Sequence, residues 1–239
     1  MTITTAMVLA AGLGTRMRPL TNDRPKALVN VGGKALIDHV LDRLIAGGIT
    51  RAVVNVHAFA DMLEAHVKKR RDMEIVISDE RALLMETGGG VKQARALLGD
   101  GPIVVANIDS VWEEQTSAVA RLIAAYDPSR MSALLMLAAM NNCVGFETPG
   151  DFHMDAQGQL AWRGAAARSD WAFMGVQVMD PTLVDGEPLE PFSLRRAWDR
   201  ALAGGRFYGL PLNGFWMHVG DPAAREAAEA RLAGAAARA

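Results

Sequence analysis

A glycine-bearing loop directly after the first apolar run constrains this chain more than any other feature. Residues 9–21 read LAAGLGTRMRPLT, and a Pro-Lys pair follows at 25–26. Glycine lets the backbone approach a ligand closely and turn its N–H groups toward phosphate oxygens. Arg16 adds charge as a planar fork and Lys26 as a flexible point charge. The loop therefore predicts a site for a phosphate-bearing ligand at the carboxyl end of the first strand.

Two common phosphate-binding motifs are absent from this loop. The P-loop pattern GxxxxGK[ST] does not occur in it, and the dinucleotide pattern GxGxxG fails because Met17 stands where the third glycine is required. Pro19 also disfavours a helix that starts directly after Gly12. An ordinary turn between a strand and a helix, with arginines facing solvent, is the plain alternative.

Short runs of branched residues alternate with helical patterns along the first 140 residues. We expect strands at 3–9, 51–56, 74–77, 103–109 and 133–138. We expect helices at 36–46, 59–69, 88–98 and 117–126. This alternation is typical of an α/β fold in which helices cover both faces of a mainly parallel sheet.

The rhythm changes after about residue 141. Strands are expected at 151–154 and 159–163, around a hairpin turn, and again at 171–179 and 207–212, with a helix that begins at Ser193. The last helix starts at Asp221-Pro222, an N-cap followed by proline, and continues toward residue 239. With no linker or repeat in the chain, we expect a single domain over 1–239, in which 141–220 is a β-rich elaboration.

Composition excludes several classes of partner. The 25 basic and 27 acidic side chains give a net charge of −2, which provides no general attraction to nucleic acid or acidic membranes. Cys143 is the single cysteine, so no intramolecular disulfide can form, as is usual in a reducing compartment. No apolar run approaches the roughly 20 residues that span a bilayer, and no basic residue precedes the apolar start. We expect a cytoplasmic protein whose oligomeric state the sequence leaves open.

The loop sequence LAAGLGTRMRPLT, followed by PKAL, resembles the signature of the sugar-1-phosphate nucleotidyltransferases, also called nucleoside-diphosphate-sugar pyrophosphorylases. The likeness extends to FWMHVGDP at 215–222. Within this family, ETGGG at 86–90 and GDF at 150–152 are similar to the branch that uses UTP and N-acetylmuramate 1-phosphate in peptidoglycan recycling of the cell wall. A mannose-1-phosphate guanylyltransferase is one alternative, and a non-catalytic nucleotide- or sugar-binding regulator is another. The resemblance implies a Rossmann-like fold with a nucleotide-binding half, about 1–140, and a sugar-binding half, about 141–220.

The resemblance also implies roles for individual residues. Enzymes of this family join a nucleoside triphosphate to a sugar 1-phosphate and release pyrophosphate, so their side chains position reactants and neutralise charge. Arg16 would stabilise the departing pyrophosphate, and Lys26 would reach the α-phosphate or the attacking phosphate. The nucleotide would be contacted from two glycine-bearing segments, at Ala10, Ala11, Gly12, Gly14, Thr15, Arg16, Glu86, Thr87 and Gly88. The sugar 1-phosphate would be contacted by Lys26, Gly89, Asn107 and Asp151.

Two further features bear on the ligands. Three successive glycines, 88–90, at a helix start cost backbone entropy, which predicts close approach of a ligand, with a flexible hinge as the alternative. A muramyl sugar carries a lactyl carboxylate that calls for a cation. Arg163 and Arg168 are the candidates for that cation.

Asp109 ends an expected strand and resembles the family's metal-binding aspartate, which would hold Mg²⁺ against phosphate oxygens. The family's second metal ligand, an Asp or Asn, is replaced here by His218. Imidazole suits softer metals than Mg²⁺. Three roles for His218 stay open: a direct ligand that favours Mn²⁺, a residue behind a Mg²⁺ completed by water and triphosphate oxygens, or a replacement that impairs catalysis. We favour the second role, which leaves Asp109 as the main catalytic carboxylate beside Arg16 and Lys26.

Overall fold

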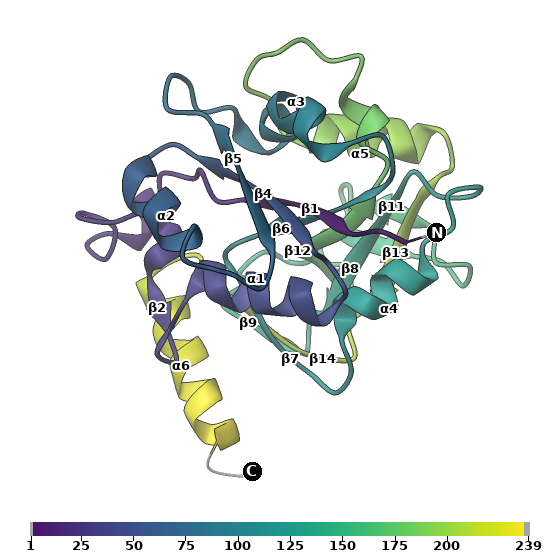
Figure 1. Ribbon diagram of the computed structural model, residues 1–239. Helices are drawn as coiled ribbons and strands as arrows, with labels where there is room; N and C mark the ends of the chain where they lie inside the picture. Colours follow the sequence, from purple (N-terminus) through teal and green to yellow (C-terminus); the bar gives the residue numbers. More distant parts are fainter. Residues whose placement is uncertain (1, 237–239) are drawn as a thin grey trace.

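The computed structural model describes residues 2–236 and is built around a nine-stranded sheet (Figure 1). The strands of this sheet are β1 (Thr5–Leu9), β4 (Arg51–Val56), β5 (Glu74–Asp79), β6 (Ile103–Asn107), β8 (Ala133–Ala139), β10 (Phe152–Met154), β11 (Leu160–Trp162), β12 (Trp171–Met179) and β13 (Phe207–Pro211). The helices are α1 (Leu36–Ala46), α2 (Ala60–Val67), α3 (Glu86–Leu98), α4 (Ala118–Ala125), α5 (Arg195–Ala203) and α6 (Pro222–Ala236). Short 3₁₀ turns lie at Thr15–Met17, Lys26–Leu28 and Pro181–Val184.

The central sheet is mainly parallel, as predicted. Strands β5, β4, β1 and β6 lie side by side in that order and run parallel. Strand β12 is antiparallel to both of its long neighbours, β6 and β8, and β13 is parallel to β8. The predicted hairpin is present as β10 and β11, and it joins the sheet at one end of β12. The second half of the chain therefore continues the sheet that the first half begins.

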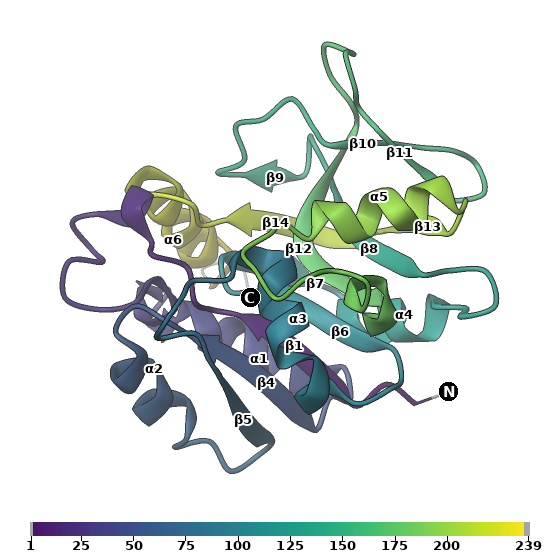
Figure 2. The same cartoon turned by 90° about the horizontal axis from the view of Figure 1, so that it is seen from above.

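Helices cover both faces of the sheet because the strand side chains alternate between two apolar cores. In β1, Ala6 and Val8 lie in one core and Met7 lies in the other. Helices α1, α2 and α4 pack in the first core, and α3 and α5 in the second (Figure 2). Helix α1 illustrates the pattern: its buried positions 36, 37, 40, 41 and 44 form one stripe at helical spacing.

Two smaller sheets complete the fold, and neither was predicted. Strands β7 (Ser110–Glu114) and β14 (Gly214–His218) pair antiparallel, with β9 (Cys143–Val144) on the other side of β14. Strands β2 (Asn30–Val31) and β3 (Lys34–Ala35) form a short ribbon. The pairing of β7 with β14 sets His218 opposite Ser110. It thereby brings a residue near the C-terminus beside the end of β6.

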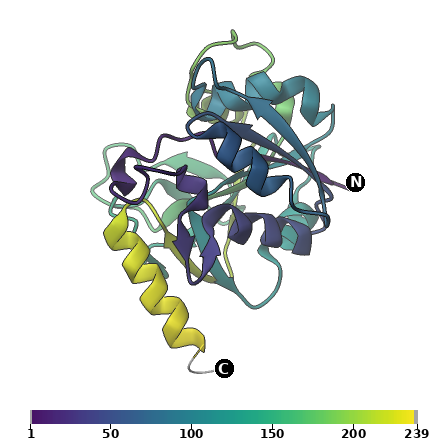
Figure 3. The same cartoon turned by 60° about the vertical axis from the view of Figure 1, so that its left-hand side comes forward.

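Helix α6 lies beside β2 and projects from the rest of the molecule (Figure 3). The backbone N–H of Ala224 donates to Asp221 Oδ1 at 2.8 Å, which confirms Asp221 as a capping residue. The predicted continuation of this helix to residue 239 lies, for its last three residues, outside the described part of the chain. Among residues 2–236 no helix is long and apolar enough to cross a membrane.

Candidate active site

Two cavities meet beyond the carboxyl ends of β1 and β6. The larger has a volume of about 480 Å³ and is lined by the loop after β1, the start of α3 and the residues after β6. The smaller has a volume of about 240 Å³ and is lined largely by aromatic side chains from the second half of the chain. Asn107 and Asp109 line both cavities. A ligand that fills both would therefore pass beside the Asp109 carboxylate.

The loop after β1 holds two basic side chains over the larger cavity. Gly14 has a φ of 63°, which residues other than glycine rarely adopt, and a Cβ at this position would lie 2.9 Å from the Cβ of Lys26. Both the backbone conformation and the space therefore require glycine here. Thr21 Oγ1 donates to the Gly14 carbonyl oxygen at 2.8 Å and closes the loop. Lys26 is buried and Arg16 is exposed, and both line this cavity.

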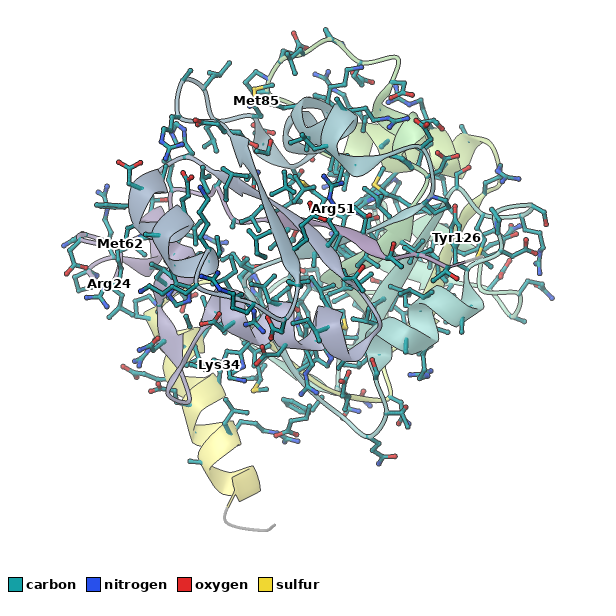
Figure 4. The ribbon with its side chains drawn as sticks, in the orientation of Figure 1. Arg24, Lys34, Arg51, Met62, Met85 and Tyr126 are labelled. Atoms are coloured by element: carbon teal, nitrogen blue, oxygen red, sulfur yellow. The ribbon has the colours of Figure 1, made fainter. Side chains whose placement is uncertain are left out.

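Unlike Arg24, Lys26 and Lys34, Arg16 has no ion-pair partner among the described side chains. Arg24 is paired with Asp23, and Lys34 with Asp42; both cations lie at the edge of the molecule in Figure 4. A guanidinium over a cavity without a carboxylate partner is suited to binding an anion.

Lys26, Asp109 and His218 form a charged cluster where the cavities join. Lys26 Nζ donates to Asp109 Oδ2 at 2.8 Å, and His218 Nε2 lies 3.6 Å from the same oxygen. Burial by itself would raise the pKa of Asp109, but the charge of Lys26 and the contact with His218 hold that pKa well below its usual range. Asp109 is therefore a carboxylate at all ordinary pH values.

The imidazole of His218 is oriented by a second contact. Its Nδ1 lies 3.0 Å from the carbonyl oxygen of Gly145, and because a carbonyl only accepts, Nδ1 carries the proton. Nε2 then faces Asp109. Burial works to lower the pKa of His218, yet the nearby Asp109 carboxylate raises it overall. The ring therefore faces Asp109 with Nε2. In the protonated imidazolium this atom carries a proton and can donate it, and in the neutral ring it carries a lone pair.

A buried polar relay connects the two walls of the larger cavity. Asn55 Oδ1 accepts from the backbone N–H groups of Ala10, at 2.6 Å, and Ala11, at 3.2 Å. Asn55 Nδ2 donates to Glu80 Oε1 at 2.7 Å. Glu80 Oε2 accepts from the N–H of Met85, at 3.0 Å, just before α3 (Figure 4 labels Met85). The loop after β1 and the start of α3 are therefore held at a fixed separation by two side chains.

The family is evident once this geometry is compared with known proteins. The nucleotidyl transferase family matches residues 5–144. N-acetylmuramate alpha-1-phosphate uridylyltransferase of Caulobacter vibrioides is 54% identical over 233 residues, which is 95% of this chain and 96% of that protein. The chain belongs to the sugar-1-phosphate nucleotidyltransferases.

More distant relatives agree with this assignment. Mannose-1-phosphate guanyltransferase beta-A of Xenopus laevis is 28% identical, over 91% of this chain and 61% of that protein. Among solved structures, the UDP-glucose pyrophosphorylase from Acinetobacter baumanii shares the fold, with a TM-score of 0.81 at 17% identity over 96% of this chain and 93% of that one. The predicted family and Rossmann-like fold are confirmed.

Most of the predicted site residues of this nucleotidyltransferase line the two cavities. Those on the larger cavity are Ala11, Gly12, Gly14, Thr15, Arg16, Lys26, Glu86, Thr87, Asn107 and Asp109. Those on the smaller cavity are Asn107, Asp109, Asp151 and His218. Ala10 is buried behind the loop and lines neither cavity. The N–H groups of Ala10 and Ala11 both donate to Asn55 Oδ1, so these two amides are already occupied within the protein.

The glycines of α3 need a different explanation from the predicted one. The N–H groups of Gly88 and Gly89 both donate to the carbonyl oxygen of Phe192, at 2.8 and 3.1 Å, and neither glycine lines a cavity. A Cβ at Gly88 would overlap the Phe192 ring, and one at Gly89 would lie 2.5 Å from the carbonyl oxygen of Glu190. These glycines allow the chain around residues 190–194 to pack on α3, so their expected ligand contacts are not supported.

Glu86 and Thr87 do reach the larger cavity. Glu86 has a φ of 60°, a value that residues other than glycine rarely adopt. Thr87 Oγ1 accepts from the N–H of Leu194 at 2.9 Å. The strained backbone of Glu86 thus lies in the wall of the larger cavity. Such strain is common at functional sites, and it persists only where the surrounding structure holds the backbone in place.

Asp151 and Asn107 are set by the irregular part of β12. Asp151 Oδ2 accepts from the N–H of Phe173 at 2.9 Å, and burial raises the pKa of this carboxyl. The register between β12 and β8 shifts between Phe173 and Gln177. At this point Gly175 has a φ of 84°, and a Cβ there would lie 3.1 Å from the Cβ of Asn107. Glycine therefore lets β12 pass close to Asn107.

The structure also reveals site residues that the sequence analysis missed. Neither Arg163 nor Arg168 lines either of the two cavities, and Arg163 Nε donates instead to the carbonyl oxygen of Gly150 at 3.1 Å. The arginine that lines the smaller cavity is Arg195. Asn55, an amide within the apolar run RAVVNV, carried a signal that pattern analysis could have used, because a buried amide requires partners.

Proposed function

We propose that this protein transfers a uridylyl group from UTP to N-acetylmuramate 1-phosphate and releases pyrophosphate. The observation that carries the proposal is the meeting of two cavities at Asp109, one beside the unpaired Arg16 and one walled by aromatic side chains. Aromatic faces suit a sugar ring, whose C–H groups are apolar, and a glycine-bearing loop suits phosphates. The choice of UTP and of this sugar rests on the 54% identity to the Caulobacter enzyme.

In the proposed reaction, an oxygen of the sugar phosphate attacks the α-phosphorus of UTP. A new P–O bond forms as the bond from the α-phosphorus to the bridging oxygen breaks, and its electron pair leaves with pyrophosphate. Arg16 neutralises charge on the departing pyrophosphate from the larger cavity. Lys26, at the junction, exchanges its contact with Asp109 for the α-phosphate or the attacking phosphate, which brings the two anions together.

The residues at the junction are suited to a divalent cation shared with the nucleotide. Asp109 is an ionised oxygen ligand, and His218 Nε2 is directed at the same place. Within residues 2–236 no group of three or more His, Cys, Asp or Glu side chains is placed to hold a metal ion. Asp109 would therefore hold Mg²⁺ together with triphosphate oxygens and water, as Mg²⁺ commonly binds. The ion would neutralise charge on the phosphates, and His218 would lie behind it; direct ligation by His218 is the alternative role, and it would favour Mn²⁺.

Residues 141–220 contribute most of the smaller cavity and form the sugar-binding part of this proposal, on the same sheet as the nucleotide-binding part. Asn107 and Asp151 lie where sugar hydroxyl and amide groups would be bound.

The experiment that tests this function follows pyrophosphate release with Mg²⁺ and a matrix of substrates. UTP, GTP, CTP and dTTP are each combined with the 1-phosphates of N-acetylmuramate, N-acetylglucosamine, glucose and mannose. We expect the largest kcat/KM for UTP with N-acetylmuramate 1-phosphate. A preference for GTP with mannose 1-phosphate would favour the guanylyltransferase alternative, and no pyrophosphate from any pair would favour a non-catalytic regulator.

A further inference from the structure

The smaller cavity contains one guanidinium for which the reaction chemistry has no use. Arg195 is the first residue of α5 and lines this cavity, but not the larger one. Its Cζ lies 4.2 Å from the centroid of the Trp162 ring, so the guanidinium stacks on an aromatic wall of the cavity. Among the described side chains no carboxylate forms an ion pair with Arg195.

Its neighbours on the same helix are paired differently. Arg196 lies 3.2 Å from Glu187 and 3.4 Å from Glu190, and Arg200 also pairs with Glu187. Neither Arg196 nor Arg200 lines either of the two site cavities. Pairing on the surface is thus the rule along α5, and Arg195 is the exception.

Two carboxylates lie near Arg195, but neither forms an ion pair with it, and each accepts a hydrogen bond from another group. Asp199, four residues further along α5, accepts from the indole N–H of Trp162 at 2.7 Å. Asp151 accepts from the N–H of Phe173 at 2.9 Å. Asp199 therefore fixes the Trp162 ring on which Arg195 stacks, and stacking occupies the face of the guanidinium. The N–H donors in its plane stay available, in the fork geometry that matches a carboxylate.

We propose that Arg195 forms an anion subsite for a carboxylate substituent on the sugar ring, and that this subsite selects an acidic amino sugar 1-phosphate over a neutral one. The inference rests on the proposed function and makes it more specific. The phosphate end of the sugar lies at the junction beside Asp109 and Lys26, because those residues face the nucleotide cavity. The ring lies among the aromatic walls, and its acidic side group faces Arg195. A neutral sugar would leave the subsite empty and gain nothing from it.

The test compares two substrates that differ only by the lactyl group, N-acetylmuramate 1-phosphate and N-acetylglucosamine 1-phosphate, each with UTP. For Arg195→Gln we expect the ratio of their kcat/KM values to fall roughly 10- to 100-fold, the range for loss of a hydrogen bond to a charged group. The fall should appear in KM for the acidic sugar. Arg195→Lys, which keeps the charge but loses the fork, should recover part of the ratio. Arg196→Gln is the matched control and should leave the ratio unchanged.

The failures of the two proposals are distinguishable. If the wild-type protein releases no pyrophosphate with N-acetylmuramate 1-phosphate, the proposed function is wrong. If it does, but Arg195→Gln lowers activity with both sugars equally, or changes neither, the subsite is wrong while the function stands. Circular dichroism melting curves of each variant identify any loss of activity that comes from misfolding. If Arg195→Gln misfolds, the ratio of kcat/KM values measured for Arg195→Lys tests the subsite in its place.

Discussion

Replacing Asn55 with aspartate tests the relay that holds the two walls of the nucleotide cavity together. The Asn55→Asp side chain would keep an oxygen for the N–H groups of Ala10 and Ala11, but it would put a second carboxylate oxygen where Nδ2 now donates to Glu80 Oε1 at 2.7 Å. Glu80 is 1% exposed, and burial already raises its pKa. Two buried carboxylates at this distance cannot both be ionised cheaply, so the pair should hold one proton.

The magnitude and its pH dependence follow from that shared proton. If the pair's upper pKa rises by about two to three units, the cost at a pH above it is about 3–4 kcal/mol, at 1.36 kcal/mol per unit. The unfolded chain does not hold this proton at neutral pH. The folded protein takes it up as the pH falls through the raised pKa, so the penalty is full at high pH and shrinks toward the unfolded pKa near 4. When protonated, the pair again has a donor between the two side chains.

The assay is urea unfolding of wild type and Asn55→Asp between pH 5 and pH 8. We expect a stability difference of about 3–4 kcal/mol at pH 8 that shrinks strongly by pH 5. Asn22→Asp, at an exposed position, is the control and should stay within about 0.5 kcal/mol of wild type. A difference that does not depend on pH, or no difference at pH 8, would refute the relay.

Three further predictions concern single residues. Asp109→Asn should lower kcat at least 100-fold without unfolding the protein, measured by pyrophosphate release, while Asp100→Asn at an exposed position should not. Glu86→Gly should raise the free energy of unfolding in urea by about 0.5–1 kcal/mol. Glycine removes the cost of the positive φ, and the greater entropy of the unfolded chain offsets only part of this gain; Glu86→Ala should show no such gain. Gly88→Ala should lose about 1–3 kcal/mol because its methyl group overlaps the Phe192 ring, whereas Gly101→Ala, with open space around its Cβ, should be near neutral.

The parts of the fold that local pattern determines were predicted from the sequence. Helix α1 begins and ends at the predicted residues because one apolar stripe and a following pair of glycines define it. Strands β4 and β12 also have the predicted bounds, since each is a run of apolar and branched residues. Strands β7 and β14 were missed, because SVWEE and GFWMH become strands only by pairing with each other across a hundred residues. That pairing is a tertiary effect that local pattern does not carry.

In the candidate site, too, local features were predicted and features that depend on tertiary packing were missed. The phosphate site in the loop after β1 was predicted because glycine, arginine and lysine together at the end of a strand are typical of phosphate binding. The glycines at the start of α3 were attributed to a ligand, but Gly88 and Gly89 make room for the chain at residues 190–194, and Gly90 makes room for Glu80 and Asn55. Arg195 had no signal, because its place in the cavity depends on the position of Trp162, which comes from a hairpin in another part of the chain.

Isothermal titration calorimetry with UTP and Mg²⁺ tests most directly whether the loop after β1 holds a nucleotide. We expect wild type to bind, Arg16→Ala to bind roughly 10- to 100-fold more weakly, and Arg18→Ala, an exposed arginine two residues away that lines neither cavity, to bind like wild type. Absence of binding to wild type, or an equal loss in both variants, would contradict the placement of the triphosphate at this loop.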